Sequence, residues 1–355
     1  MQKGWRCMRK FDYSFLDNGL LPANLVNLTS NITALKTMAG VRKDEYMQIF
    51  TALEAVAKVQ SVKSSNAIEG IVTSNECIAE IVRQNSAPLN HNKAEIAGYR
   101  DALDEIHRGY EYIDFRQSDI LRLHETMMSF VGYEYGGQYK TDDNVIPEID
   151  NDGNRRVRFR PIPASETAEA MEQLELAYMD ARSNSNINQL LLIPCVILDF
   201  LCIHPFRDGN DRMSRLLSLL LLYKNGFDAG KYVSFEEQIN NYKYHYYEAL
   251  RQSSVDWNTN ENTYFPFIEN FLSTLYMCYK ELDRRFAVVH GKKITKKARI
   301  EATVLNSLTP LSKAEICKIL PDVSATTVEA VLGAMVRTGS VKRIGAGRAT
   351  RYIKG

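Results

Sequence analysis

The sequence lacks paired cysteines, although six cysteines are spread over its 355 residues. Because no two of them form a C-x-x-C pair, the pattern argues against a disulfide framework and against a structural zinc site. We therefore expect a protein of the reducing cytoplasm. The scattered cysteines are Cys7, Cys77, Cys195, Cys202, Cys278 and Cys317.

A long apolar run is also missing. The stretch 190–203 is apolar over 14 residues, but it contains Pro194 and Asp199. It falls short of the roughly 20 residues that span a bilayer, so we expect a buried helix there and no membrane segment. Residues 1–10 are basic and polar and lead into no apolar core of a signal peptide.

The chain as a whole has no large excess of positive or negative charge, because its net charge is +1. Residues 291–355 nevertheless carry 13 Lys and Arg against 4 Asp and Glu, a net of +9, and the remainder has 31 against 39, a net of −8. This asymmetry predicts an anionic partner for the C-terminal region, with nucleic acid first among the candidates. The length allows two or three domains of an ordinary soluble protein.

What the chain does contain is a series of helical patterns. In residues 44–68, apolar side chains recur every three positions, and Gly70 supplies a helix stop. Residues 11–40 are expected to pack on the body as an arm. Further helices are predicted at 74–85, 92–108, 117–130, 165–181, 190–203, 213–223, 235–250 and 264–289.

The stretch 136–163 interrupts the helical pattern. Asn151-Asp-Gly-Asn154 is a strong turn signal, and beyond it Val157 and Phe159 alternate with arginines. We predict a β-hairpin over 143–160. Because a lone hairpin is only marginally stable in water, it must either pack on the helices or accept a strand from a partner.

Residues 291–355 have a pattern of their own. Ser312 and Ser324 are expected N-caps, and Glu315 completes a capping box with Ser312. Three helices followed by two short strands predict a winged helix-turn-helix domain. Such a domain can bind DNA, with Arg343 and Arg348 on phosphates, or it can serve protein contacts and dimerisation. The helices are predicted at 298–307, 312–320 and 324–338.

A polar cluster lies between two apolar helices, and its sequence is His204-Pro-Phe-Arg-Asp-Gly-Asn-Asp-Arg-Met-Ser-Arg215. Imidazole can take up a proton near neutral pH, so His204 is a candidate general base. The alternative is a histidine whose hydrogen bonds are satisfied at a helix end. Backbone N–H groups of the Gly209-Asn210 turn, at a helix N-terminus, can cradle an anion. Asp208 beside phosphates suggests bound Mg²⁺.

Two arginines follow on the next helix. Arg212 and Arg215 lie three residues apart and can hold phosphates bidentately. A solvated face is the alternative, but the leucines at 216–222 indicate that this helix is buried. The cluster therefore predicts a loop that binds anions and handles protons.

This loop resembles the signature of the Fic family, H-P-F-x-[D/E]-G-N-G-R-x-x-R. The resemblance extends over roughly 45–285, with the hairpin at the position of the family's flap. It implies a mainly α fold, a Fic-type helical bundle with a β-hairpin flap, followed here by the winged helix-turn-helix domain. The expected divisions are an N-terminal helical region (1–110), a catalytic core (111–290) and the C-terminal domain (291–355).

The resemblance implies transfer of AMP from ATP to a Ser, Thr or Tyr hydroxyl of a target protein, with release of pyrophosphate. His204 would deprotonate the hydroxyl, and Asp208 would hold Mg²⁺ against the phosphates. The target would lie against the flap, 143–160, as an added strand. The implied nucleotide-binding residues are Phe206, Arg207, Asp208, Gly209, Asn210, Asp211, Arg212 and Arg215, with Tyr246 and Tyr247 near the adenine.

Asp211 departs from the family pattern, because it replaces the second glycine of the signature. A carboxylate that faced the phosphates would repel them. We therefore expect the side chain to point outward; otherwise it lowers activity or adds a contact to a cation.

Upstream, Ser65-Asn-Ala-Ile-Glu69-Gly70 resembles the family's inhibitory motif, [S/T]-x-x-x-E-[G/N]. The resemblance implies that Glu69 pairs with Arg215 and blocks the seating of the γ-phosphate. The enzyme would then be inhibited by its own N-terminal region. A helix end with a surface glutamate is the alternative for this short pattern.

Other hypotheses stay open. The same Glu69 can instead position a water that removes AMP from a modified target, and the family also includes other nucleotide or phosphate donors. A regulator that acts through the winged helix belongs to a different functional class. Self-modification and a homodimer are further expectations.

Overall fold

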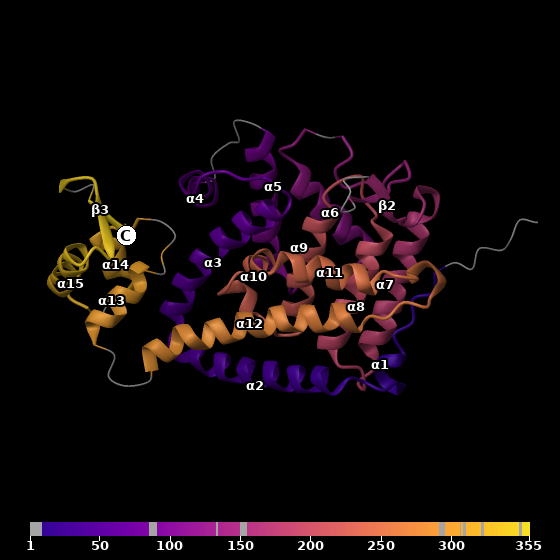
Figure 1. The fold of residues 1–355 in the computed structure, drawn as a ribbon, viewed down its shortest axis with the longest axis horizontal. Coiled ribbons are helices and arrows are strands. Elements are labelled where there is room, and N and C mark those ends of the chain that lie inside the picture. The colour runs from indigo at the N-terminus through magenta and orange to yellow at the C-terminus, as the bar shows by residue number, and fades with distance from the viewer. Residues whose placement is uncertain are drawn as a thin grey trace, which may run out of the picture.

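The structure is a computed structural model that describes residues 9–84, 91–132, 134–149, 155–290, 295–305, 307, 310–320, 323–347 and 350–355. An elongated helical body carries a small unit beyond the end of its last long helix, α12 (Phe265–His290) (Figure 1). Within the described residues, the body and the small unit each bury a hydrophobic core of their own. The prediction of a mainly α fold is confirmed.

Most of the predicted helices of the body are present within a few residues of their expected bounds. Besides α12, the helices of the body are α1 (Phe15–Asn18), α2 (Ala23–Glu45), α3 (Met47–Ile68), α4 (Asn75–Gln84), α5 (His91–Gly109), α6 (Gln117–Met128), α7 (Thr167–Ser183), α8 (Gln189–Ile203), α9 (Asn210–Lys224), α10 (Phe235–Asn241) and α11 (Lys243–Ser253). Short 3₁₀ turns are η1 (Ala164–Glu166), η2 (Ala229–Lys231) and η3 (Trp257–Thr259).

Helices α8 and α9 pack on each other within the body. The side chain of Asn188 caps α8 by accepting a hydrogen bond from the backbone N–H of Leu190, and the helix is buried from Leu190 to Ile203. The loop 204–209 joins the two buried helices, so both of its ends are held rigidly. Among the described helices, none is long and apolar enough to cross a membrane.

Asp199, the charged interruption of α8, ties the N-terminal arm to the body. It accepts hydrogen bonds from the Tyr13 hydroxyl at 2.8 Å and from the Trp257 indole N–H at 2.6 Å, and Arg9 forms an ion pair with it at 3.3 Å. Burial raises the pKa of Asp199, although Arg9 and the hydrogen-bond donors oppose this shift. A buried carboxylate is tolerated here because the arm supplies its partners.

The arm continues into α2, a helix that the sequence analysis did not predict. It lies along α12 (Figure 1). Asn, Ser and Thr fill much of α2 and disfavour a helix in isolation. Packing decides the outcome, since Leu25, Leu28, Ile32, Leu35 and Ala39 alternate at spacings of three and four and all meet the core.

The single helix predicted over 235–250 is two helices that break at Tyr242, so that prediction was wrong. Tyr242 leaves the helical conformation, with φ −120° and ψ 33°. The break starts α11 at Lys243, whose ammonium group donates to the carbonyl of Ile68 at 2.5 Å. This bond joins the start of α11 to the end of α3.

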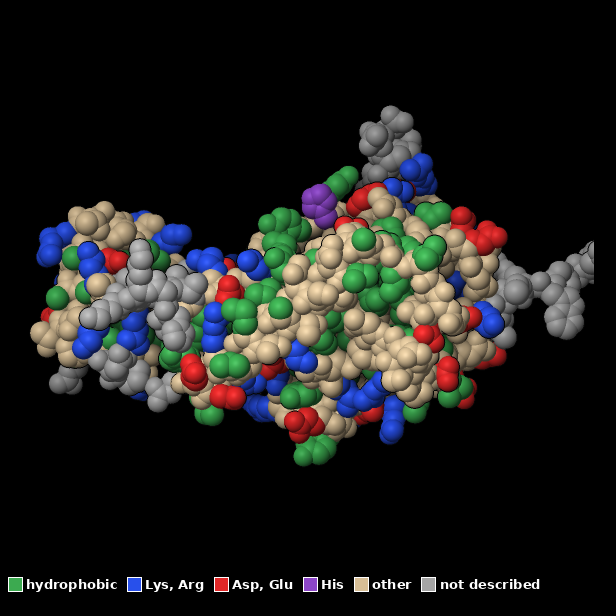
Figure 2. Space-filling model, turned by 90° about the horizontal axis from the view of Figure 1, so that it is seen from below, with side chains coloured by type: hydrophobic (Ala, Val, Ile, Leu, Met, Phe, Trp, Pro, Cys, Tyr) green, Lys and Arg blue, Asp and Glu red, His purple; other side chains and the backbone are tan. Residues whose placement is uncertain are grey.

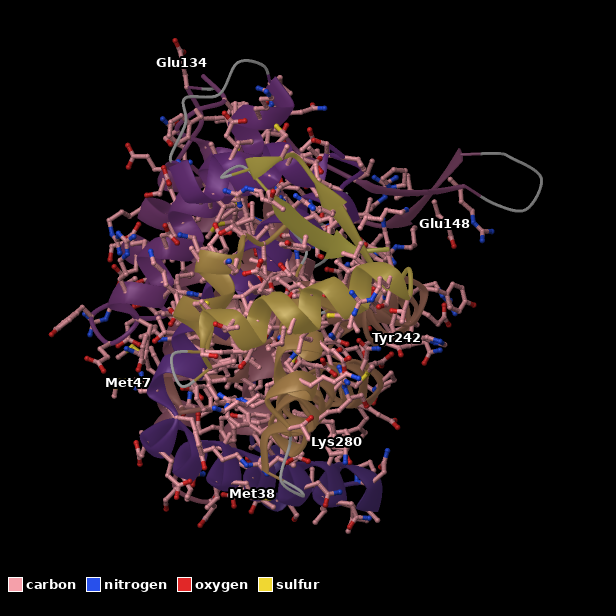
Figure 3. All side chains as sticks on the ribbon, turned by 90° about the vertical axis from the view of Figure 1, so that its left-hand side faces the viewer. Met38, Met47, Glu134, Glu148, Tyr242 and Lys280 are labelled. Atoms are coloured by element: carbon pink, nitrogen blue, oxygen red, sulfur yellow. The ribbon has the colours of Figure 1, made fainter. Side chains whose placement is uncertain are left out.

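The predicted hairpin is formed by the antiparallel strands β1 (Ile146–Ile149) and β2 (Arg155–Phe159), and its turn lies outside the described residues. Phe159 is buried, with its ring 6.1 Å from that of Trp257. Val157 does not join this apolar face and is exposed, because the hairpin extends beyond the helices near Glu148 (Figure 3). The base of the hairpin is packed and its outer part is not.

The small C-terminal unit contains three helices and an antiparallel strand pair in the predicted order. Ser312 and Glu315 form the predicted capping box, and the side chain of Ser324 accepts from the backbone N–H of Thr327. Leu311 also bridges to Tyr352, which ties the start of the second helix to the strands. The elements are α13 (Lys296–Leu305), α14 (Lys313–Ile319), α15 (Ala325–Arg337), β3 (Val341–Ile344) and β4 (Arg351–Lys354).

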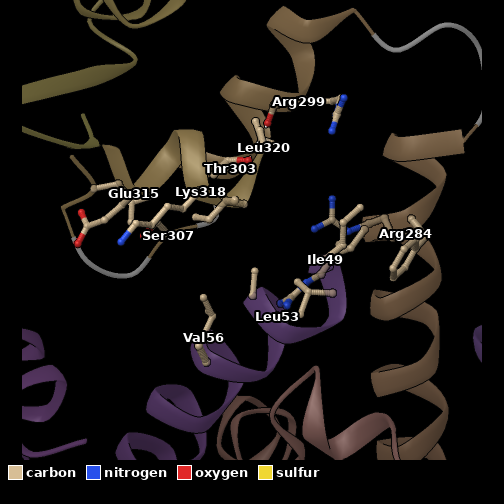
Figure 4. Close-up of a pocket in the computed structure, with 16 residues that line it drawn as sticks. Ile49, Leu53, Val56, Arg284, Arg299, Thr303, Ser307, Glu315, Lys318 and Leu320 are labelled. Atoms are coloured by element: carbon tan, nitrogen blue, oxygen red, sulfur yellow. Dashed lines mark hydrogen bonds between the residues drawn. The ribbon is translucent and has the colours of Figure 1, made fainter. Parts of the chain in front are cut away.

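A largely apolar cavity of about 470 Å³ separates this unit from the body (Figure 4). Ile49, Leu53 and Val56 of α3 line one side, and Leu320 lines the other. Arg284, near the end of α12, lies at the edge and pairs with Glu281. The C-terminal unit therefore borders the first half of α3, whose last turn reaches the site described next.

Candidate active site

His204 ends α8 in a left-handed backbone conformation, with φ 52° and ψ 61°. Residues other than glycine seldom adopt this conformation, and it is common at functional sites. The backbone N–H of His204 still donates to the carbonyl of Phe200 at 3.0 Å, so the helix end remains closed. The turn leads the chain from α8 into the loop 204–209.

The imidazole of His204 is neutral near pH 7. Burial lowers its pKa to about 4 and the nearby Lys140 acts in the same direction, whereas the carbonyl of Leu201 and the carboxylate of Asp208 oppose the shift. A general base must be unprotonated before it accepts a proton. His204 is in that state.

The loop is held in shape by its own side chains. The Asn210 amide accepts from the backbone N–H of Phe206 at 2.9 Å and donates to the carbonyl of Phe206 at 2.8 Å. Gly209 precedes α9 with φ 80°, and a Cβ atom there would lie 2.6 Å from the Cε of Met127. Glycine is therefore needed at this position, and the N-terminus of α9 stays open toward the loop.

A layer of residues behind the loop was not singled out from the sequence. His124 stacks on Phe206 with the ring centroids 3.7 Å apart, and its Nε2 lies 3.1 Å from the carbonyl of Asp208. Its Nδ1 accepts from the backbone N–H of Gly137, so Nε2 carries the proton. Burial lowers the pKa of His124 to about 4, which keeps this arrangement at neutral pH.

Lys140 supports the loop from a second direction. Its ammonium group donates to the carbonyl of Ile203 at 3.1 Å and to the side chain of Asn144 at 3.0 Å. Burial lowers its pKa to about 8. No motif in the sequence marks Lys140 or His124, because the atoms that they contact at the ends of the loop are backbone carbonyls 63 and 84 residues away in the chain.

The loop borders a polar cavity of about 320 Å³, called here the loop cavity. Among the described residues that line it, carboxylates outnumber arginines. A polyphosphate can enter such a cavity only if a cation accompanies it or if carboxylates move away. The lining residues are Glu69, Ile71, Glu95, His204, Arg207, Asp208, Gly209, Asn210, Asp211 and Arg212.

The end of α3 holds Arg215. The guanidinium donates to the Ser65 hydroxyl at 2.9 Å, to the Ser65 carbonyl at 3.1 Å and to Oε1 of Glu69 at 2.7 Å. Arg215 is fully buried, and although burial opposes its charge, Glu69 leads the groups that raise its pKa. Gly70 follows with φ 81° and ends the helix beyond Glu69. The sequence-predicted partners Ser65, Glu69 and Arg215 are therefore in contact.

The start of α5 holds Arg212. Nη1 of Arg212 lies 2.8 Å from Oε2 of Glu95, and Nη2 lies 3.9 Å from Oδ2 of Asp208. Glu95 is buried, and its other oxygen pairs with His91 at 2.8 Å. The sequence analysis did not select Glu95, since a glutamate in an amphipathic helix carries no local signal for such a role.

Asp211 does not point outward into solvent. It is half-buried and lines both the loop cavity and a neighbouring cavity of about 240 Å³ beneath the hairpin. Burial raises the pKa of Asp211, with Arg215 and Arg158 acting against it. The expected outward orientation was wrong, because the start of α9 places Asp211 at the walls of both cavities.

The other predicted nucleotide-binding residues divide between these spaces. Tyr247 lines the cavity beneath the hairpin together with His204 and Asp211, whereas Tyr246 is buried beside Arg215 beneath α9. Phe206 is buried behind the loop, and Arg207 is exposed, with its guanidinium 5.3 Å from the ring centre of Tyr135. The structure therefore brings Tyr247 to the cavities but not the side chains of Tyr246 and Phe206.

Asp208 has the chemistry of a magnesium ligand. Its side chain is about half exposed to the loop cavity, and Oδ1 accepts from the backbone N–H of Gly209 at 2.6 Å. Mg²⁺ is commonly held by one or two carboxylates together with substrate phosphates rather than by an all-protein cage. No group of three or more possible metal ligands occurs among the described residues.

Comparison with known proteins agrees with this geometry. Residues 113–222, which contain the loop, match the model of the Fic/DOC family, so the chain carries a Fic/DOC family domain. No curated protein sequence matches the chain.

Solved structures extend the likeness of the fold to most of the chain. A Fic family protein from Desulfovibrio desulfuricans G20 is 20% identical with a TM-score of 0.62, over 95% of this chain and 97% of that one. A Fic domain containing signaling protein from Bacteroides thetaiotaomicron VPI-5482 is 20% identical with a TM-score of 0.54, over 72% and 95%. Fic-1 from C. elegans is 16% identical with a TM-score of 0.58, over 75% and 74%.

Proposed function

We propose that the protein is an auto-inhibited protein adenylyltransferase, which transfers AMP from ATP to a hydroxyl group of a target protein. The observation that carries the proposal is the loop 204–209, where neutral His204 faces the same cavity as the open N-terminus of α9. A proton acceptor beside an anion cradle suits an attack by a hydroxyl on a phosphate.

In this proposal the hydroxyl oxygen attacks the α-phosphorus of ATP and a new P–O bond forms. The bond between the α-phosphorus and the oxygen that bridges it to the β-phosphate breaks, and pyrophosphate leaves with that oxygen. The hydroxyl proton passes to His204. Arg212 and Arg215 would bind the β- and γ-phosphates. A bound Mg²⁺ would neutralise phosphate charge, and Asp208 is the residue that would hold it. The acceptor segment would lie beside the hairpin, whose outer part extends beyond the helices.

The inhibited state follows from the bonds made by Arg215. Glu69 and Ser65 occupy the Nε and Nη2 donors of its guanidinium, so a γ-phosphate that binds this edge bidentately would have to displace them. Glu69 would also repel the phosphate. Relief therefore requires that Glu69 leave Arg215, which Glu69→Gly imitates.

Mass spectrometry of the full chain after incubation with Mg²⁺ and ATP tests the proposal. We expect Glu69→Gly to gain the mass of AMP on its own hydroxyl groups, and His204→Ala in the same background to gain none. Addition of a phosphoryl group instead would identify a different donor chemistry. No modification of Glu69→Gly, of itself or of proteins in a lysate, would contradict the proposal.

Removal of AMP is a second candidate for the same site. Glu69 lines the cavity beside His204 and can align a water there. Incubation of an AMP-modified preparation with the intact chain distinguishes AMP transfer from AMP removal. If the preparation loses AMP with the intact chain but not with a variant that lacks Glu69, the result supports AMP removal.

DNA binding by the C-terminal unit is a candidate from another class. Cationic side chains gather on the small unit (Figure 2), and Lys342 and Arg343 of β3 are exposed. Against it, the exposed face of α15 includes Glu329, which pairs with Lys313. A gel-shift titration of the full chain over a range of salt concentrations tests it, because binding to phosphates weakens steeply with salt.

A further inference from the structure

Two arginines of α9 are each paired with a glutamate from a different helix, and the two pairs differ in how the glutamate is held. Glu69 follows the last residue of α3, next to Gly70, and its side chain is 27% exposed. Glu95 lies in the second turn of α5, and its side chain is 10% exposed. A residue at a frayed helix end moves at lower cost than one inside a packed helix.

The bonds of Glu95 also hold it in place. One carboxylate oxygen contacts Arg212 at 2.8 Å, and the other contacts His91 at 2.8 Å, one turn earlier on α5. Movement of Glu95 away from Arg212 would break both contacts and leave a buried charge unpaired. Glu95 is therefore poorly suited to act as a displaceable inhibitor.

The guanidinium of Arg212 is held along one edge. Glu95 takes Nη1, while Nη2 lies 3.9 Å from Asp208, the expected magnesium ligand. Both Arg212 and Glu95 line the loop cavity. A guanidinium carries five N–H donors, so an arginine anchored by one carboxylate keeps donors for a phosphate.

We propose that Glu95 is a positioning residue that orients Arg212 toward the phosphates of the nucleotide, in contrast to Glu69, which withholds Arg215. The inference rests on the proposed function, because it assumes that a nucleoside triphosphate binds in the loop cavity. Glu95 itself touches no phosphate. It acts through Arg212, whose charge it also keeps paired when the cavity is empty.

Glu95 could instead be a second inhibitory carboxylate. In that case its removal would release Arg212 and strengthen ATP binding. The two roles predict opposite signs, so they can be separated by one set of kinetic measurements.

The test uses the full chain in the Glu69→Gly background, where the proposed transfer activity is no longer inhibited. The rate of AMP incorporation is measured against the concentration of Mg²⁺-ATP for Glu95→Ala, Glu95→Gln and the parent. We expect Glu95→Ala to raise KM for ATP about tenfold to a hundredfold, as for a catalytic group displaced by about 1 Å. Glu95→Gln keeps a side-chain oxygen that can accept a hydrogen bond from Arg212 and should recover most of the loss.

A matched control lies on the same helix. Asp101 also pairs with an arginine, Arg100, at 2.7 Å, but it does not line the loop cavity. Asp101→Asn should leave KM unchanged. A thermal unfolding curve for each variant identifies loss of activity that follows from unfolding.

The outcomes are distinguishable. If Glu69→Gly itself neither binds ATP nor transfers AMP, the proposed function fails before Glu95 is tested. If that parent is active and Glu95→Ala has the same or a lower KM, the positioning role is overturned. An equal loss for Glu95→Ala and Glu95→Gln at unchanged KM would also overturn it, since that pattern would reflect structure alone.

Discussion

Helices α3 and α5 both contact α9, and each presents a glutamate to one of its arginines. The chemistry of the two pairs is the same, a carboxylate oxygen within 2.8 Å of a guanidinium nitrogen. Their attachment differs. Glu69 stands at a helix end and, together with Ser65, occupies Nε and Nη2 of Arg215, whereas Glu95 is packed inside a helix and contacts Nη1 of Arg212.

The difference teaches that an ion pair does not by itself reveal its role. A pair contributes to inhibition when its carboxylate occupies the donors that a ligand needs and can leave at moderate cost. It contributes to binding when the carboxylate stays and leaves donors free. Variants of Glu69 and variants of Glu95 should therefore change activity in opposite directions.

The largest expected effect comes from His204, which lines the loop cavity together with Glu69 and Glu95. In the Glu69→Gly background, His204→Ala should lower AMP transfer by about 10² to 10⁴-fold, because the hydroxyl proton loses its acceptor. The rate of label incorporation from α-labelled ATP measures it. Retained ATP affinity would show that chemistry rather than binding is lost, and an active His204→Ala variant would contradict the role of His204.

Acid should destabilise the fold through three histidines that burial keeps neutral. Burial lowers the pKa of His107 on α5 to about 3 and those of His124 and His204 to about 4, from 6.5. Below pH 6.5 the unfolded chain therefore binds protons that the folded chain excludes. We expect the free energy of unfolding to fall by about 1.4 kcal/mol per pH unit for each histidine between pH 6.5 and 5.

Urea unfolding at a series of pH values checks this expectation. The carboxyl groups of Asp199 and Asp211 have raised pKa values, so the folded chain binds protons there that the unfolded chain does not, and they act in the opposite direction. A stability that is flat from pH 7 to 5 would show that these histidines are not held neutral.

Shortening the two glutamates sharpens the comparison. Glu69→Asp withdraws the carboxylate from Arg215 and should raise self-modification by about fivefold to a hundredfold, the usual range of a coupling between two sites. Glu95→Asp in the Glu69→Gly background should lower transfer at subsaturating ATP. Equal signs for the two shortened side chains would remove the distinction between the pairs.

The smallest effect is expected from Ser65→Ala. This change deletes the hydroxyl that accepts from Nε of Arg215 at 2.9 Å, while Glu69 and the Ser65 carbonyl still hold the guanidinium. Loss of one hydrogen bond with a typical net contribution of about 1 kcal/mol should raise activity about fivefold. Ser64→Ala, at the neighbouring buried position on α3, is the matched control and should leave activity unchanged.

Much of the body could be predicted from the sequence because burial imposes helical periodicity on residues such as those of α3 and α8. The capping box at Ser312 was predictable for a similar reason, since all its atoms lie within four residues. Helix α2 was missed because its polar composition disfavours a helix and only packing on α12 stabilises it.

The site was predictable in part. His204, Asp208 and the arginines of α9 follow from a local pattern, and Glu69 follows from a second pattern upstream. The inward position of Asp211 could not be derived, because the walls of the two cavities that it lines come from segments far apart in the chain. Glu95, His124 and Lys140 have partners remote in sequence, and no spacing rule selects them.

The rate of AMP incorporation into the intact chain, Glu69→Gly, Glu95→Ala and the double variant tests the central claim most directly. With Mg²⁺-ATP held below saturation, we predict that Glu69→Gly raises the rate and that Glu95→Ala lowers it in the Glu69→Gly background. A rise on removal of Glu95 as well as on removal of Glu69 would contradict the account, because both pairs would then be inhibitory.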